Sequence, residues 1–289
     1  MSHIYKAHAK INLGLDVIRR REDGYHEVKM IMQTLSLHDV VTIEETSEKG
    51  IVVTSNSGSI PCDEHNLAYK AAKLLMDEFS VDKGVRINIE KNIPVAAGMA
   101  GGSTDAAATM KGINDIFNLG LSEEELMKRS VKIGADVPYC IMEGTALSEG
   151  IGEVLTRLNC PPECKVLIAK PPIDVSTKFV YENLHANSLT WHPDIDGMVD
   201  SIRNGDLKGI CDRMENVLET VTVKEYPIIE EIKSSMKNKG AVNSLMSGSG
   251  PTVFGIFDNE EKADKAYKGL KEKYKTSQIH LTELYNREV

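Results

Sequence analysis

A run of small residues between a strand pattern and a helix pattern is the feature that most constrains the fold of this chain. Residues 85–90 alternate apolar and polar side chains, as a half-buried strand does, and the Ala-rich segment from Asp105 to Phe117 is typical of a helix. Between them, Pro94 to Asp105 contains three glycines and three alanines. A strand, a glycine-rich turn and a helix in this order indicate an α/β or α+β protein.

The backbone amides of this loop are accessible to an anion. Small side chains leave the N–H groups uncovered, and the first turn of a helix adds unpaired donors and the positive end of the dipole. Ser103 and Thr104 contribute hydroxyl groups. The loop has no Gly-Lys-Ser/Thr of a Walker loop and does not match the dinucleotide fingerprint. From the loop alone, a glycine-rich helix start without a ligand remains an alternative.

A second glycine turn, Ser247 to Thr252, leads into the apolar strand Val253 to Phe257. By itself this turn is explained as a tight hairpin, because Gly, Ser and Pro are ordinary turn residues. Together with the first loop, it is a candidate second wall of a phosphate site.

Hydrophobic periodicity places further elements along the chain. Strict alternation from Lys10 to Val17 predicts a strand with Lys10 and Asn12 on its polar face, and Asn66 is a plausible helix cap. Other strands are expected over Val28 to Leu37, Val40 to Glu44, Ile51 to Thr54, Val166 to Ala169, Val242 to Met246 and Gln278 to Leu284. Other helices are expected behind the Ser122 and Glu125 capping box, ending near Gly134, and over Thr177 to Leu184, Leu207 to Leu218, Pro227 to Lys237 and Glu260 to Lys273.

The 289 residues suggest two domains, 1–158 and 159–289, because Asn159 to Glu163 supplies two prolines between apolar segments. With 34 basic and 43 acidic residues, the formal net charge is −9, which disfavours nucleic acid as the main partner. No apolar run reaches about 18 residues and no secretory leader is recognisable, so a cytoplasmic protein without membrane partners is expected.

Three motifs together resemble the GHMP kinase superfamily: AKINLGL at residues 9–15, PVAAGMAGGSTDAA at 94–107 and SGSGPTVF at 247–254. The resemblance spans nearly the whole chain. It implies an α+β, two-domain fold with a ribosomal protein S5 domain 2-like N-terminal domain and a ferredoxin-like C-terminal domain. The loop departs from the family pattern at Met99, Ala100 and Thr104; alanine in place of glycine matters only where a positive φ is required.

Within the superfamily, DGYHEV at 23–28 and GADVPY at 134–139 most resemble members that act on methylerythritol linked to cytidine diphosphate. The resemblance implies transfer of phosphate from ATP, with Mg²⁺, to the 2-hydroxyl of that small molecule in the non-mevalonate route to isoprenoid precursors, by a monomer or weak homodimer. Two alternatives stay open. One is a GHMP kinase for homoserine, mevalonate or a sugar, and the other is a non-catalytic nucleotide-binding regulator.

The resemblance implies that Asp136 is the general base and that Lys10 keeps it ionised, orients the hydroxyl and neutralises charge. Without the resemblance, Asp136 would be a turn-capping residue before Pro138 and Lys10 a solvated strand lysine.

The resemblance also implies which residues bind the two substrates. Asn12, Tyr25, His26 and Tyr181 would contact the cytidyl substrate, and Asn66, Leu67 and Lys91 would lie near the adenine or ribose. The phosphates of ATP would lie on Pro94, Val95, Ala96, Ala97, Gly98, Met99, Ala100, Gly101, Gly102, Ser103 and Thr104. Phosphate oxygens and water would supply most magnesium ligands, with Ser103 a candidate for one oxygen.

Overall fold

The structure is a computed structural model that describes residues 2–287, and the chain forms two compact units that interleave in sequence. Unit 1 is drawn from segments 1–9, 37–95 and 100–143, and unit 2 from segments 10–36, 96–99 and 144–289. Two long strands, β1 (Ser2–Arg20) and β2 (His26–Thr46), contribute to both units. The proposed division into continuous domains at residue 158 stays a prediction.

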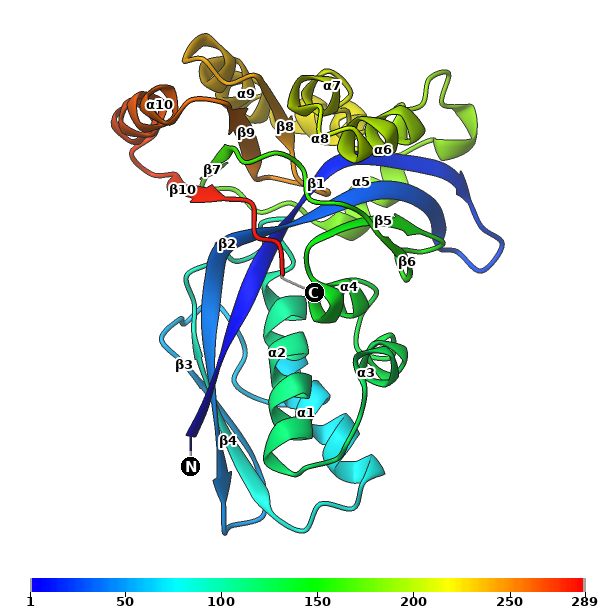
Figure 1. The fold of residues 1–289 in the computed structure, drawn as a ribbon, viewed down its shortest axis with the longest axis vertical. Coiled ribbons are helices and arrows are strands. Elements are labelled where there is room, and N and C mark those ends of the chain that lie inside the picture. The colour runs from blue at the N-terminus through cyan, green and yellow to red at the C-terminus, as the bar shows by residue number, and fades with distance from the viewer. Residues whose placement is uncertain (1, 288–289) are drawn as a thin grey trace. The chain divides into compact units, whose positions relative to one another are not determined.

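Unit 1 is a sheet covered by helices. Strand β4 (Gly84–Glu90) pairs antiparallel with β2 and parallel with β3 (Gly50–Ser55). Helices α1 (Leu67–Glu78) and α2 (Gly101–Ile116) pack together on one face of these strands (Figure 1). The side chains of Val85, Ile87 and Ile89 are buried, whereas those of Arg86, Asn88 and Glu90 are exposed, as the period of two predicts.

The helix starts of unit 1 follow their capping residues. Asn66 caps α1, and its Oδ1 accepts a hydrogen bond from the Ala68 amide at 2.8 Å. The predicted capping box of Ser122 and Glu125 begins α3 (Glu123–Ser130), which ends four residues before Gly134. A six-residue helix, α4 (Val137–Met142), follows and was not predicted.

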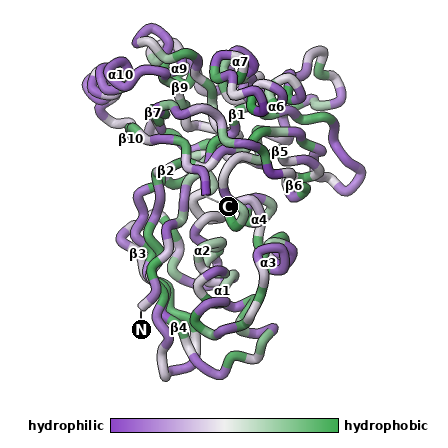
Figure 2. The backbone as a smooth tube through the Cα atoms, viewed as in Figure 1, coloured by the Kyte–Doolittle hydropathy of each residue, from purple (hydrophilic) through white to green (hydrophobic). Residues whose placement is uncertain are grey.

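In unit 2, β2 pairs antiparallel with β5 (Thr145–Glu149), which pairs with β6 (Val154–Arg157). A second, antiparallel sheet has the order β10-β7-β9-β8, and α9 and α10 pack on it. Its elements are β7 (Lys165–Lys170), α9 (Ile228–Asn238), β8 (Asn243–Met246), β9 (Val253–Phe257), α10 (Glu260–Lys273) and β10 (Gln278–Glu283). This βαββαβ arrangement is the ferredoxin-like topology that the resemblance implies. Helix α10 is largely hydrophilic (Figure 2), because only one side of it is buried.

Short helices connect β7 to α9 in unit 2. They are α5 (Thr177–Asn183), the 3₁₀ helix η1 (Ala186–Ser188), α6 (Ile195–Arg203), α7 (Leu207–Asp212) and α8 (Glu219–Glu225). The prediction of one helix over Leu207 to Leu218 was wrong, because the chain leaves the helix after Asp212 to place Asn216 against β1 and a glycine turn. Within residues 2–287, no helix combines the length and the apolar character of a membrane span.

One further prediction fails in β2. The two strands expected at Val28 to Leu37 and Val40 to Glu44 are a single continuous strand. Two polar residues, His38 and Asp39, lie between the two apolar runs. The structure satisfies one of them, Asp39, with a buried lysine and two backbone amides, so the strand continues through it.

Candidate active site

The two glycine turns meet inside unit 2. Gly98 has φ +69°, and a Cβ at this position would overlap the carbonyl oxygen of Ser247. The Ser247 hydroxyl donates a hydrogen bond to the Gly98 carbonyl at 3.0 Å. Glycine is therefore required at 98 by both backbone conformation and close approach. The sequence prediction that the second turn lies beside the first is confirmed.

Lys10 and Asn12 lie at the same place. The Lys10 amide donates to the Met99 carbonyl at 3.2 Å, and its ammonium group donates to Asn12 Oδ1 at 2.8 Å. Asn12 Oδ1 would be 3.5 Å from a Cβ on Gly248. Only 5% of Lys10 is exposed, so the alternative of a solvated strand lysine is wrong. Unit 2 thus gathers Lys10, Asn12 and both turns.

The second half of the first loop belongs to unit 1, where it begins α2. Ala100 is the N-cap residue, with φ +58°, and its carbonyl accepts the first helical hydrogen bond, from Thr104. A Cβ on Gly101 would lie 3.2 Å from Lys91 Nζ, and one on Gly102 would lie 3.5 Å from Leu67. The predicted nucleotide neighbours Leu67 and Lys91 therefore lie against this helix start.

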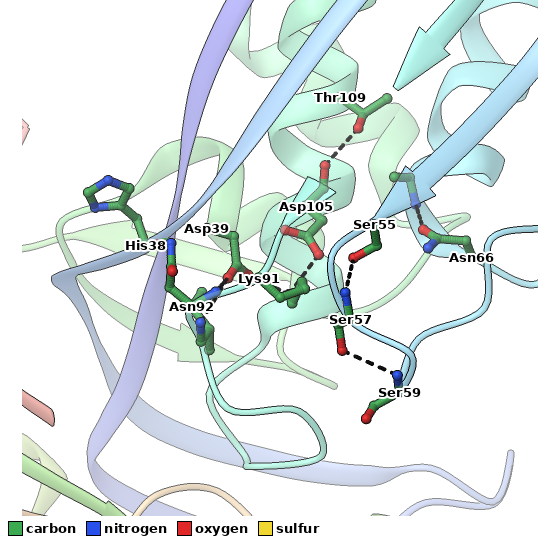
Figure 3. Close-up of polar contacts among 12 residues, drawn as sticks. His38, Asp39, Ser55, Ser57, Ser59, Asn66, Lys91, Asn92, Asp105 and Thr109 are labelled. Atoms are coloured by element: carbon green, nitrogen blue, oxygen red, sulfur yellow. Dashed lines mark hydrogen bonds and ion pairs between the residues drawn. The ribbon is translucent and has the colours of Figure 1, made fainter. Parts of the chain in front are cut away.

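Lys91 is buried between two carboxylates (Figure 3). Its side chain is 6% exposed, and its ammonium group donates to Asp105 Oδ2 at 2.8 Å and to Asp39 Oδ2. Asp39 also accepts hydrogen bonds from the amides of Asn92 and Ile93 at 2.5 and 2.8 Å. Burial raises the pKa of Asp105 to about 7; Lys91 opposes the shift and the charge of Asp39 adds to it. We call these three side chains the Lys91 cluster.

Asn66 also has protein partners for both ends of its amide. Its Nδ2 donates to the Pro61 carbonyl at 2.6 Å, while Oδ1 caps α1 (Figure 3). Asn66 and Lys91 therefore hold the framework next to the loop. A direct contact of either side chain with a nucleotide stays a prediction.

Asp136 occupies the N-cap position of α4 with Pro138 in the first turn, but its side chain makes no capping hydrogen bond to that helix. The side chain of Asp136 therefore does not cap helix α4. The residue is half-buried. The role of Asp136 as general base stays a prediction.

Two of the predicted pyrimidine-binding residues lie together in unit 2, although 155 positions separate them. The rings of His26 and Tyr181 have centroids 5.0 Å apart and are tilted by 46°. Tyr25 is 60% exposed. Burial, and secondly the charge of Arg20, lowers the pKa of His26, so its imidazole is neutral near pH 7 and offers one donor and one acceptor.

The left-handed backbone of Ala100 leads to a prediction about stability. This conformation costs a residue with a Cβ about 1–2 kcal/mol, so Ala100→Gly is expected to raise the free energy of unfolding by about 0.5–1 kcal/mol after the entropy of the added glycine. Urea denaturation measures this change in the free energy of unfolding. The control Ala106→Gly, inside α2, should instead lose about 1 kcal/mol. Equal losses in the two variants would show that Ala100 is unstrained.

The comparisons with known proteins agree with this geometry. The models described as GHMP kinases N terminal domain and GHMP kinases C terminal match residues 66–144 and 198–276. A Lachnoclostridium phytofermentans protein named 4-diphosphocytidyl-2-C-methyl-D-erythritol kinase is 56% identical over 262 residues, 91% of this chain and 90% of the relative. A Lachnospira eligens protein of the same name is 51% identical over 280 residues, 97% of each chain.

A solved structure extends the agreement to three dimensions. The crystal structure of a 4-(cytidine 5'-diphospho)-2C-methyl-D-erythritol kinase has a TM-score of 0.84 and 29% sequence identity, and the match covers 99% of this chain and all of that chain. The expected two-domain α+β fold of the GHMP kinases, a class that uses ATP, is thereby confirmed. Given more than half of the aligned residues identical over nearly the full length, the chain belongs to the 4-diphosphocytidyl-2-C-methyl-D-erythritol kinase family.

Proposed function

We propose that this chain transfers the γ-phosphoryl group of ATP to the 2-hydroxyl of 4-diphosphocytidyl-2-C-methyl-D-erythritol, giving the 2-phosphate and ADP. The names of the relatives supply the substrate and the reaction class. The two adjoining glycine turns support a phosphate site, because their small residues expose backbone amides.

The ring pair of His26 and Tyr181 is the observation that carries the choice of substrate. A pyrimidine base offers a flat ring for stacking and a polar edge for hydrogen bonds. A tyrosine ring beside a neutral imidazole matches both properties, and homoserine, mevalonate and sugars have no base to use them. Tyr25, with its ring exposed in the same unit, would supply a second aromatic surface.

In the proposed mechanism, Asp136 accepts the proton of the 2-hydroxyl as its oxygen attacks the γ-phosphorus. Lys10 neutralises charge on the transferring group, and Asn12 holds the Lys10 ammonium in place. The oxygen–phosphorus bond to ADP breaks as the new bond to the substrate oxygen forms. Proton removal contributes about 10²- to 10⁴-fold to such a rate, so positioning by the loop amides provides much of the remainder.

Magnesium fits as a companion of ATP. Among the described residues, no group of three His, Cys, Asp or Glu side chains is arranged to hold a metal ion. A hard cation that keeps several waters needs few protein ligands, and the Ser103 hydroxyl in the first turn of α2 is the candidate for one. When bound, magnesium neutralises phosphate charge. The proposal also includes a cytoplasmic location and a monomer or weak homodimer.

The test is release of ADP from Mg-ATP by the purified protein with each of four alcohols: the cytidyl substrate, homoserine, mevalonate and galactose. Saturable turnover with the cytidyl substrate alone is expected. Turnover with another alcohol only would keep the kinase class and overturn the assignment of His26 and Tyr181. If ATP binds but no ADP is released with any of the four alcohols, a nucleotide-binding regulator would be favoured.

Tyr181→Ala is expected to raise the KM for the cytidyl substrate by about 5- to 150-fold and to leave the KM for ATP unchanged. The reason is the loss of base stacking, which contributes about 1–3 kcal/mol. Initial rates at varied concentrations of each substrate measure the two constants. Phe179→Ala removes an exposed aromatic ring from the same helix, α5, and should change neither constant. Equal effects of the two variants would contradict the stacking role.

A further inference from the structure

Asn216 is a buried side chain whose hydrogen bonds all serve the second glycine turn and its own backbone. It is 3% exposed. Its Nδ2 donates to the carbonyl of Met246 at 2.9 Å and to that of Gly248 at 2.8 Å, on either side of Ser247. Its Oδ1 accepts the Leu218 amide at 2.9 Å, which fixes the orientation of the amide group. Both donor hydrogens are therefore committed to carbonyls on either side of Ser247, one at the end of β8 and one in the second glycine turn.

The backbone around Asn216 is itself fixed to β1, the strand that carries Lys10 and Asn12. The Leu15 amide donates to the Glu215 carbonyl at 2.9 Å, and the Val217 amide donates to the Leu15 carbonyl at 3.0 Å. These two bonds flank Asn216. The side chain thus links the strand of the proposed catalytic lysine to the second turn.

Two neighbours of Asn216 hold the same turn. Glu219 Oε1 accepts the Met246 amide at 2.8 Å, and its other oxygen pairs with Lys233 at 2.6 Å. The Thr222 hydroxyl donates to the Ser249 carbonyl at 3.2 Å. Residues 216–222 therefore contact Met246 at the end of β8, and Gly248 and Ser249 in the second glycine turn.

The second glycine turn is hydrogen-bonded to the first loop, so it also restrains that loop. Between the two carbonyls that Asn216 holds, the Ser247 hydroxyl donates to the Gly98 carbonyl at 3.0 Å. The carbonyl of the next residue, Met99, accepts a hydrogen bond from the Lys10 amide. Because a peptide unit is planar, fixing a carbonyl also fixes the direction of the following N–H group. The Gly98 carbonyl sets the direction of the Met99 amide in this way.

We propose that Asn216 is a positioning residue that holds the second glycine turn against Gly98 and so aims the amides of the first loop at the phosphates of ATP. It acts through Ser247 and does not touch ATP. The inference rests on the proposed function, which assigns the first loop to ATP. None of the sequence motifs pointed to Asn216, since its partners lie 30 and 32 residues away.

The experiment compares Asn216→Leu with Asn243→Leu. Leucine removes the donors without adding a charge that would repel phosphates. Asn243 is a matched control, because its Nδ2 also donates to a carbonyl, that of Cys211, and its Oδ1 also accepts an amide, that of Ser244. These bonds lie in the same unit and do not touch either glycine turn. Calorimetry measures the Kd of Mg-ATP and of the cytidyl substrate, and hydrogen exchange measures protection of residues 96–99.

Asn216→Leu is expected to weaken ATP binding by about 5- to 150-fold, the range for leaving a buried hydrogen-bonding group unpaired, and to speed exchange at residues 96–99. The Kd of the cytidyl substrate should stay within about twofold in both variants, as should the Kd of ATP in Asn243→Leu. Unchanged ATP binding in Asn216→Leu would overturn the inference. So would equal weakening in both variants, since that indicates a general loss of stability.

Ser247→Ala tests the same route if Asn216→Leu does not fold. It removes only the hydroxyl that reaches Gly98, and it should weaken ATP binding and loosen residues 96–99 in the same way. ATP binding and exchange unchanged in Ser247→Ala would contradict the route. If the wild type binds ATP without turning over the cytidyl substrate, the proposed function fails and this comparison still decides the role of Asn216. If the wild type does not bind ATP, both proposals fall.

Discussion

Asp136→Asn is expected to lower kcat with the cytidyl substrate by about 10²- to 10⁴-fold, because the amide cannot accept the proton of the 2-hydroxyl. The binding of ATP should not change, since the proposed ATP contacts are made by the glycine turns. The replacement has the same size and shape as aspartate, and the side chain makes no capping bond to α4, so the helix start should persist. Steady-state rates and the Kd of Mg-ATP measure the two quantities.

Asp206→Asn is the control for Asp136→Asn. Asp206 is also an N-cap residue, and its Oδ1 accepts the Gly209 amide at 2.9 Å. Asparagine caps a helix as well as aspartate does, so this variant should retain stability and kcat. Undiminished kcat in Asp136→Asn would remove Asp136 from the role of general base. Loss of ATP binding together with kcat would indicate a structural role instead.

The features that the sequence could predict are those encoded by neighbouring residues. The capping box of Ser122 and Glu125, the cap at Asn66 and the alternation of β4 are all local patterns, and the structure confirms them. The same holds for the second glycine turn between β8 and β9. Hydrophobic periodicity and turn chemistry act over a few residues, so these features do not depend on contacts with distant parts of the chain.

The features that the sequence could not predict depend on distant partners. Asp39 interrupts an apolar run and reads as the end of a strand, yet Lys91, 52 residues away, lets the strand continue through it. Asn216 lies in what reads as a continuous helix, and it leaves the helical path to bind carbonyls 30 and 32 residues further on. In both cases a tertiary hydrogen bond overrides the local preference.

The site shows the same division. The motifs placed Lys10, Asn12 and both glycine turns correctly in one region, because these residues contribute backbone shape as well as chemistry. They did not show that Lys91 is enclosed by two carboxylates. Of these two carboxylates, Asp105 lies inside the loop motif and could have been noticed there, whereas Asp39 lies in no motif. Buried ion pairs between distant segments are therefore harder to predict than a loop with a sequence motif.

Lys91→Met is expected to lower the free energy of unfolding at pH 8 by about 3–5 kcal/mol, the usual result of removing one member of a buried ionic group. Methionine fills similar space but leaves Asp39 and Asp105 without a cation in a buried position. The start of α2 rests on this cluster, so ATP binding should weaken as well. Denaturation by urea at fixed pH measures the loss.

The loss in Lys91→Met should depend on pH, and its sign follows from the raised pKa of Asp105. That pKa is about 7 in the folded protein and about 4 when unfolded, so between these values the folded state holds more protons and stability falls as pH rises. Without Lys91 the carboxylates favour protonation more strongly, so the decline steepens and the loss is smaller at pH 5 than at pH 8. Lys165→Met provides the control, since Lys165 also pairs with two carboxylates, of Glu260 and Glu283, but near the surface. If burial of charge is the cause, Lys165→Met should change the free energy of unfolding little, and the loss in Lys91→Met should depend on pH. A loss in Lys91→Met that does not depend on pH would mean that packing of the lysine stem, rather than its charge, supports the start of α2.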